Sequence, residues 1–177
     1  MNPAMKSVRI LFTVAALSLV PSSAIAQADH GHEHSSEPEW AELFGDASLP
    51  TVWLSASQSS EHIAAALKAG QLEGVADWAE TIHLAAHALM DQVEESDAAK
   101  KLRLNAVLGQ AAEIADEVLD GAQHGEMDRT ARAFKRLRSA VMLTKMRLPK
   151  TVTEGTADAP RFAQAGGHSH GDDEHGH

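Results

Sequence analysis

The chain has 177 residues, no cysteine, and 25 acidic against 15 basic residues, which gives a formal charge of −10. The absence of cysteine excludes disulfides, lipid-anchored cysteine, thiolate zinc sites, iron–sulfur clusters and covalently attached haem. The acidic balance argues against nucleic acid as a partner. An acidic surface attracts cations, but it is equally an ordinary way of keeping a protein in solution.

Residues 1–26 have the layout of an export signal. Lys6 and Arg9 are followed by an apolar run over residues 10–20, and Ala-Ile-Ala at positions 24–26 forms a small-residue cleavage site. The apolar run is too short to span a bilayer comfortably, and no later segment reaches membrane-spanning length. We therefore expect cleavage after Ala26, a periplasmic mature protein, and no transmembrane anchor after signal cleavage.

Three unlike regions follow the signal. Residues 27–53 form a His-rich leader with a short helical turn, residues 54–148 are rich in Ala, Leu, Glu, Gln and Lys, and residues 149–177 form a Gly/Ala/His tail. Only the middle region, about 95 residues long, has the composition of a domain with a single core. We expect both His-rich tails to be disordered.

The middle region shows helical periodicity in four segments, separated by breaks at Gly70, at Ser96-Asp97 and around residues 121–125. Spacings of three and four alternate without error in the second segment, as in a bundle seam. The Ser55-x-x-Gln58 spacing predicts a cap at the start of the first segment. The expected seam residues of the second and fourth segments are Leu72, Val75, Ala79, Ile82, Ala86, Leu89 and Val93, and Met127, Thr130, Phe134, Leu137, Val141, Thr144 and Leu148.

Short connections force neighbouring helices antiparallel, so the sequence predicts an all-α fold, an up-down-up-down four-helix bundle. Charge supports the last helix pair. Acidic residues gather near the end of the third helix and basic residues at the start of the fourth, so that each set opposes its own helix dipole and the two sets offset one another across the turn. These residues are Glu113, Asp116, Glu117 and Asp120, and Arg129, Arg132, Lys135 and Arg136.

The leader contains one helical turn over residues 36–45, with a serine at its start, an early proline and a final glycine. Trp40, Leu43 and Phe44 share one side of this turn. The side either closes one end of the bundle or forms a docking patch for another protein.

Two histidines four residues apart, His83 and His87, share one helix face and could reach the same metal ion. Glu80 lies on the same stripe. In a hairpin that turns near Gly70, His62 falls level with Ala79 and hence near this stripe. A site of His62, Glu80, His83 and His87 would suit zinc, copper, nickel or cobalt. The alternative is that partly exposed histidines on an Ala-rich helix have no role.

Seven of the 11 histidines lie in the two tails, a composition associated with metal binding. Because only neutral imidazole is a ligand, capture by such tails would weaken below about pH 6.5. A solvating or pH-responsive tail is the alternative. The tail histidines are His30, His32 and His34 in the leader and His168, His170, His175 and His177 at the end of the chain.

Catalytic signatures are missing from the sequence. The stretch from His83 to His87 lacks the glutamate that follows the first histidine of a zinc-protease helix. Glu80-x-x-His83 is the only Glu-x-x-His pair, whereas a di-iron bundle needs two. No nucleophile elbow or phosphate-binding glycine loop occurs. We therefore expect a protein that is not an enzyme.

Three stretches, residues 67–72, 79–89 and 111–125, resemble small exported helical-bundle proteins and domains that accompany bacterial heavy-metal efflux systems. The shared features are a short Gly-Xaa-Leu turn leading into a histidine-bearing helix, the Ala-Glu-Ile-Ala-Asp-Glu-Val core and the His124-Gly125 turn. The resemblance implies handling of divalent cations or copper beside an efflux complex. It fixes neither His62 nor His87 as a ligand.

Together these features predict a periplasmic protein that binds transition-metal ions and buffers or sequesters them, or, as the resemblance implies, hands them to an efflux system. The alternative is a non-catalytic helical interaction module, associated with a membrane complex, whose histidines are incidental. A homodimer would cover the thin, Ala-rich first helix and is compatible with either function.

Overall fold

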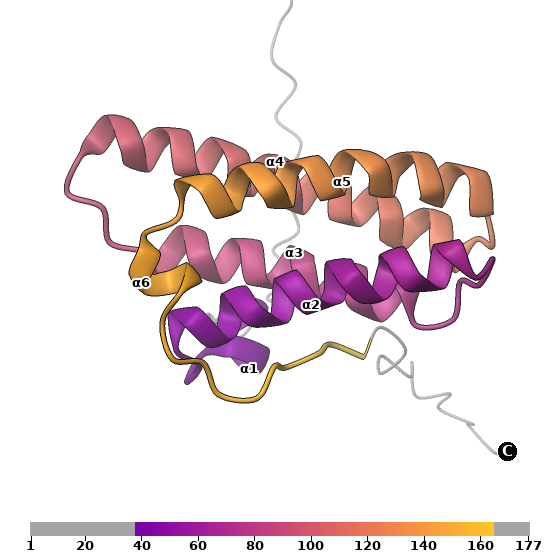
Figure 1. Ribbon diagram of the computed structural model, residues 1–177, viewed down its shortest axis with the longest axis horizontal. Coiled ribbons are helices and arrows are strands. Elements are labelled where there is room, and N and C mark those ends of the chain that lie inside the picture. Colours follow the sequence, from indigo (N-terminus) through magenta and orange to yellow (C-terminus); the bar gives the residue numbers. More distant parts are fainter. Residues whose placement is uncertain (1–37, 165–177) are drawn as a thin grey trace, which may run out of the picture. The chain divides into compact units, whose positions relative to one another are not determined.

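The computed structural model describes residues 38–164, and within this range every regular element is an α-helix. The all-α prediction is therefore confirmed for the described range. The signal, the first part of the leader (residues 27–37) and the seven tail histidines lie outside it. In chain order, the helices are α1 (Trp40–Phe44), α2 (Leu49–Lys68), α3 (Val75–Gln92), α4 (Ala98–Gln123), α5 (Met127–Arg147) and α6 (Lys150–Thr153), as Figure 1 shows.

The four long helices pack mainly against their neighbours in sequence. α2 packs on α3, α3 on α4, and α4 on α5, while α5 and α6 also touch α2 and the short α1 lies against α3. Figure 1 shows α4 and α5 side by side above α2 and α3. α3 is therefore the helix with neighbours on most of its sides.

The predicted seam of α3 is confirmed. Val75, Ala79, Ile82, Ala86, Leu89 and Val93 are all buried, and Leu72 is half-buried at the preceding turn. Burial extends beyond the seam to Thr81, Leu84, Ala85 and Ala88, because α1 and the C-terminal segment cover a further face of the helix. Most of these extra residues are small, so periodicity alone does not distinguish them from a solvent face.

The predicted breaks also hold. Gly70 and Gly125 each lie just after a helix and have φ values of +71°. Residues with a side chain adopt this left-handed conformation only with strain, whereas glycine adopts it freely. Asp97 caps α4 by accepting hydrogen bonds from the backbone N–H groups of Ala99 at 2.9 Å and Lys100 at 3.1 Å.

The predicted start of the first long helix is wrong. α2 begins at Leu49, with Ser48 as its cap and Pro50 in its first turn, so Ser55 lies inside the helix. Pro at this point needs no N–H partner and fits the first turn without strain. The Ser55 hydroxyl instead donates to the carbonyl of Thr51 at 2.8 Å.

The leader turn closes one end of the fold, as one of the two sequence interpretations had it. Phe44 is fully buried, and Trp40 and Leu43 pack against the same core. The Trp40 indole N–H also donates to the Asp91 carboxylate at 3.0 Å, which joins α1 to the end of α3. The apolar side of this turn is thus occupied within the chain.

The expectation of a disordered tail from Pro149 onward is wrong for residues 149–164. Leu148 and Val152 are buried, α6 packs on α2, and residues 154–164 run along α2 as an extended segment, which we call the strap (Figure 1). Residues 165–177 lie outside the described range.

Three hydroxyl groups hold the strap. The backbone N–H groups of Asp158, Arg161 and Ala163 donate to Thr51 Oγ1 at 2.9 Å, Ser55 Oγ at 2.8 Å and Thr81 Oγ1 at 2.9 Å. All three hydroxyl residues are fully buried. These three hydrogen bonds anchor the strap's backbone to α2 and α3.

Arg161 fixes the middle of the strap to the α1–α2 connection. Its guanidinium donates to the Leu43 carbonyl at 3.1 Å and pairs with the Asp46 carboxylate. The hydrogen bond and the charge of Arg161 lower the pKa of Asp46 below its ordinary value near 3.8. This contact is therefore complete above pH 3.8 and is lost as the pH falls further.

We expect acid to loosen the strap before it unfolds the helices. Below pH 3.8, the backbone amides of Arg161 and Ala163 should exchange hydrogen faster relative to amides in α3, measured by NMR. Asp46→Asn should remove most of this acid sensitivity, because it deletes the titrating group. The same acid response in the Asp46→Asn chain would contradict the assignment.

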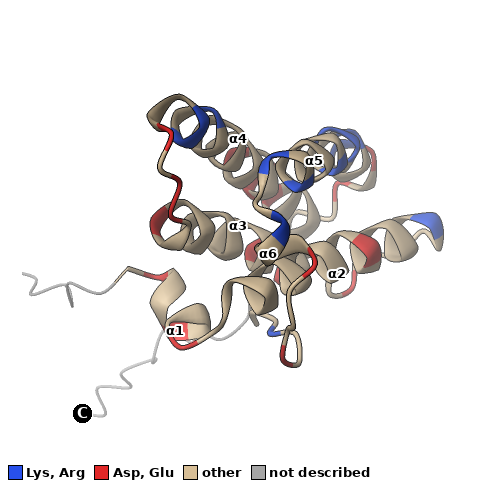
Figure 2. Ribbon diagram, turned by 60° about the vertical axis from the view of Figure 1, so that its left-hand side comes forward, with Lys and Arg blue, Asp and Glu red and all other residues tan. Residues whose placement is uncertain are grey.

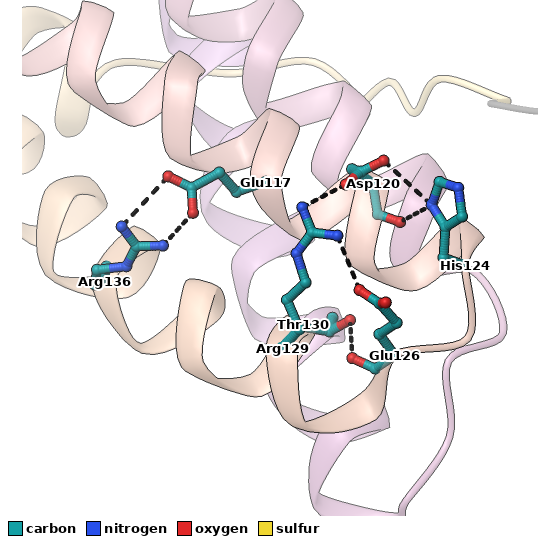
Figure 3. Close-up of polar contacts among 7 residues, drawn as sticks. All are labelled: Glu117, Asp120, His124, Glu126, Arg129, Thr130 and Arg136. Carbon is teal, nitrogen blue, oxygen red and sulfur yellow. Dashed lines mark hydrogen bonds and ion pairs between the residues drawn. The ribbon is translucent and has the colours of Figure 1, made fainter.

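The predicted charge contacts between α4 and α5 are present in part: Glu117, Asp120, Arg129 and Arg136 pair between the helices, whereas the other four predicted residues do not pair across them. Arg136 pairs with Glu117, and Arg129 pairs with Asp120 at 2.5 Å and with Glu126 at 2.8 Å (Figure 3). Glu117 precedes Asp120 along α4, whereas its partner Arg136 follows Arg129 along α5, so these two helices are antiparallel. Because all the side chains are about half exposed, each pair contributes about 0.2–1 kcal/mol.

Candidate functional site

The structure brings the two histidines of α3 together. The ring centroids of His83 and His87 lie 4.7 Å apart with an interplanar angle of 49°. The spacing of four residues places them on successive turns of one helix face, away from the buried seam. His87 is exposed and His83 is half-buried, so a solvent ion has access to the pair.

A carboxylate from α4 joins this pair. Asp116 Oδ1 lies 2.7 Å from His83 Nδ1. The nitrogen is buried and makes no hydrogen bond, so the oxygen is near Nδ1 but not aligned with the direction of its proton. The site therefore consists of His83, His87 and Asp116, contributed by α3 and α4.

Carboxylates that accept the second ring N–H commonly orient histidine ligands, and Asp116 lies close enough to His83 Nδ1 to accept it after a small rotation of the ring. A histidine that binds a metal through one ring nitrogen usually holds a carboxylate or carbonyl at the other, which fixes the orientation of the ring. Asp116 beside Nδ1 leaves Nε2 of His83 as the nitrogen for a ligand. His87 supplies a second imidazole on the same face.

His62 does not join the pair. Its ring stacks on Trp78 with centroids 5.2 Å apart, and Phe162 of the strap meets it edge-on at 5.8 Å. The predicted register is confirmed to within one residue, since His62 lies beside Trp78 where Ala79 was expected. Trp78 and His83 are five residues apart, however, which turns them about 140° from one another around α3.

Glu80 is half-buried on α3. The structure does not bring Glu80, His62, His83 and His87 together as one set of ligands. Within residues 38–164, no three His, Asp or Glu side chains converge closely enough to hold a metal ion. The tail histidines, from His30 to His34 and from His168 to His177, lie outside the described range.

Asp116 was missed as a site residue because the sequence assigned it only to the charge balance with α5. Its position in α4 could have identified it. It lies one residue past Ala115, a buried contact residue of the α3–α4 interface, so its side chain leaves the core at the edge of that interface. His83 occupies the matching edge of α3.

His124 makes a separate contact at the end of α4. Its Nδ1 lies 2.8 Å from the Asp120 carbonyl and 3.2 Å from the Asp120 carboxylate (Figure 3). Asp120 is shared with Arg129, and the histidine side chain is largely exposed. An imidazole here completes the helix C-terminus, where donors and positive charge are favourable.

A small apolar cavity lies among Trp53, Ile82, Leu89, Leu108 and neighbouring residues. Its volume of about 10 Å³ is that of roughly one water molecule. At this point the core has no room for haem or another organic cofactor.

Among residues 38–164, no helix combines the length and apolar character needed to cross a bilayer. Comparisons with protein-family models, with curated proteins and with solved structures find no match to the chain.

Proposed function

We propose that this protein is a periplasmic transition-metal-binding protein that buffers or sequesters ions such as zinc, copper, nickel or cobalt, and that it is not an enzyme. The observation that carries the proposal is the placement of the histidines. Seven of 11 lie in two short terminal segments, and two of the remaining four are paired at 4.7 Å on α3.

We infer that the terminal histidines supply the ligands that the site on α3 lacks. His83 and His87 offer two imidazoles, whereas zinc in proteins usually takes four ligands, or three and a water. The missing ligands would come from the terminal histidines, with Asp116 orienting His83. In this arrangement α3 is the fixed part of the site and the His-rich segments complete it.

The scaffold that we propose is an up-down-up-down four-helix bundle of α2 to α5, exported by a signal that is cleaved after Ala26. The order of helix contacts supports this topology, and antiparallel α4 and α5 are one of its required pairs. Delivery of the ion to a heavy-metal efflux complex follows from the resemblance noted above. That step is part of the proposal, as is a homodimer.

Calorimetric titration with Zn(II), Cu(II) and Ni(II) at neutral pH tests metal binding. We expect residues 27–177 to bind at least one of these ions, and residues 36–164, which lack both His-rich ends, to bind it at least tenfold more weakly. His83→Ala and His87→Ala should each weaken binding by about 10–100-fold or more, because losing a ligand costs at least as much as losing the residue that orients it. Asp116→Asn should reproduce part of that loss, as loss of an orienting carboxylate does.

His62→Ala is the matched control, because it removes an imidazole that stacks on Trp78 and lies apart from the pair. It should change the affinity less than threefold. Failure of residues 27–177 to bind any first-row ion at neutral pH would refute the proposed function. The chain would then be better described as a helical interaction module whose histidines are incidental.

A further inference from the structure

The outer face of α5 differs in charge from the rest of the chain. α5 carries seven Lys or Arg residues and a single acidic residue, Asp128, whereas the whole chain has ten more acidic than basic residues. Figure 2 shows the basic residues gathered along this helix. Such segregation marks a surface that attracts a negatively charged partner.

Only part of this charge is used within the fold. Arg129 and Arg136 pair with carboxylates of α4 and its turn. The other five have no ion pair with any carboxylate of residues 38–164; they are Arg132, Lys135, Arg138, Lys145 and Arg147. All five are exposed.

Large apolar side chains are exposed between these charges. Met142, Leu143 and Met146 are 61%, 42% and 76% exposed, and they occupy the second half of α5. Residues four apart share a helix face, so Met142 and Met146 form a short apolar stripe. The stripe lies between Arg138 and Lys145 on one side and Leu143 on the other.

A surface hollow lies at the head of this stripe. It has a volume of about 300 Å³ and is lined by α5 residues alone: Ala131, Phe134, Lys135, Arg138, Ser139 and Met142. Two cations and a hydroxyl are therefore set beside an apolar floor. This combination suits a phosphate group that carries an apolar body.

We propose that the outer face of α5 docks on an anionic phospholipid surface. A lipid surface presents phosphates above an acyl layer, so Arg138 and Lys145 would meet headgroups while Met142 and Met146 enter the layer beneath them. Nucleic acid offers phosphates without an apolar layer, so the methionine side chains would remain exposed to water. The docking is peripheral, and it is independent of metal binding.

Vesicle sedimentation in low-salt buffer containing a chelator tests the proposal, using residues 27–177, which include the whole compact unit from Ser36 onward. We expect binding to vesicles of equal parts phosphatidylglycerol and phosphatidylcholine, and none to phosphatidylcholine alone. Because each Lys or Arg at an anionic surface strengthens binding about fivefold, Arg138→Gln with Lys145→Gln should weaken it about 30-fold. Met142→Gln with Met146→Gln should also weaken it, by about tenfold or more.

Lys68→Gln is the matched control for Lys145→Gln, because both lysines are exposed in the last turn of a long helix and only Lys145 belongs to the α5 face. Lys145→Gln should weaken binding about fivefold and Lys68→Gln less than twofold. Absence of binding to the anionic vesicles, or equal binding by the α5 variants, would overturn the proposal. Capture of an acidic protein without vesicle binding would assign the face to a protein partner and would overturn it too.

Discussion

Gly121→Ala is expected to lower the free energy of unfolding by about 1–3 kcal/mol, the usual cost of an overpacked contact. Gly121 is buried in the last turns of α4, where α5 begins. A Cβ atom there would lie 2.8 Å from Thr130 Oγ1, 3.3 Å from Thr130 N and 3.4 Å from Thr130 Cα. Part of the obstacle is backbone, so the two helices would have to separate.

Thr130 cannot turn away at low cost. It is fully buried, and its hydroxyl donates to the Glu126 carbonyl at 2.9 Å. Separating α4 from α5 would also lengthen the contacts of Arg129 with Asp120 and of Arg136 with Glu117. The cost should therefore exceed the gain of about 0.5–1 kcal/mol that alanine normally brings to a helix interior.

Gly109→Ala is the matched control, since it places the same methyl group in the same helix where no atom beyond the adjacent residues and the helix's own neighbouring backbone lies within 4 Å. It should raise stability by about 0.5–1 kcal/mol. Urea unfolding followed by circular dichroism measures both variants. Equal and favourable effects at the two positions would mean that α4 and α5 approach less closely at their turn than the structure places them.

The sequence predicted the long helices because their signals are periodic and local. The α3 seam, the Asp97 start of α4 and the opposed charges of α4 and α5 each arise from residues three or four apart, or from residues facing across one turn. The structure confirms the first two, and it confirms the third for the pairs Asp120–Arg129 and Glu117–Arg136. The start of α2 was misjudged because Ser55 resembles a cap, whereas Ser48 followed by Pro50 marks the actual beginning.

The strap could not be predicted in the same way. Its anchors are backbone N–H groups of an extended segment, which have no side-chain pattern, and their acceptors are hydroxyls at Thr51, Ser55 and Thr81, far away in sequence. Buried Ser and Thr inside a helix were the available signal. Each needs an acceptor for its own proton, and Ser55 and Thr81 find theirs in the carbonyl four residues earlier.

The candidate site also combines features that could be predicted from local sequence with features that depend on tertiary contacts. Helical spacing placed His83 beside His87, and the hairpin turn near Gly70 placed His62 level with Ala79, one residue from the Trp78 that it contacts. It did not give the direction in which His62 points, because that depends on an aromatic contact with Trp78 and on Phe162 of the unpredicted strap. The position of Asp116 next to buried Ala115 places it at the edge of the core, but its proximity to His83 became known only from the rotation of α4 against α3.

Phe44→Ala should have the largest effect on stability, a loss of about 3–5 kcal/mol in the free energy of unfolding. Phe44 is fully buried, although it belongs to a helix of only five residues. α1 has too few backbone hydrogen bonds to be stable alone, so its position depends on this side chain and its neighbours. Displacement of α1 would also break the hydrogen bond from Trp40 to Asp91 and the hydrogen bond from Arg161 to the Leu43 carbonyl.

Phe162→Ala is the matched control, because it removes the same atoms from the strap, where Phe162 is 37% exposed and meets the His62 ring edge-on. It should cost about 1–2 kcal/mol, less than Phe44→Ala, since part of the side chain already faces water. Urea unfolding of the two variants, followed by tryptophan fluorescence and circular dichroism, measures the difference. A loss at Phe44 no larger than that at Phe162 would show that α1 is peripheral to the core, and the apolar side of the leader turn would again have to be considered as a docking surface.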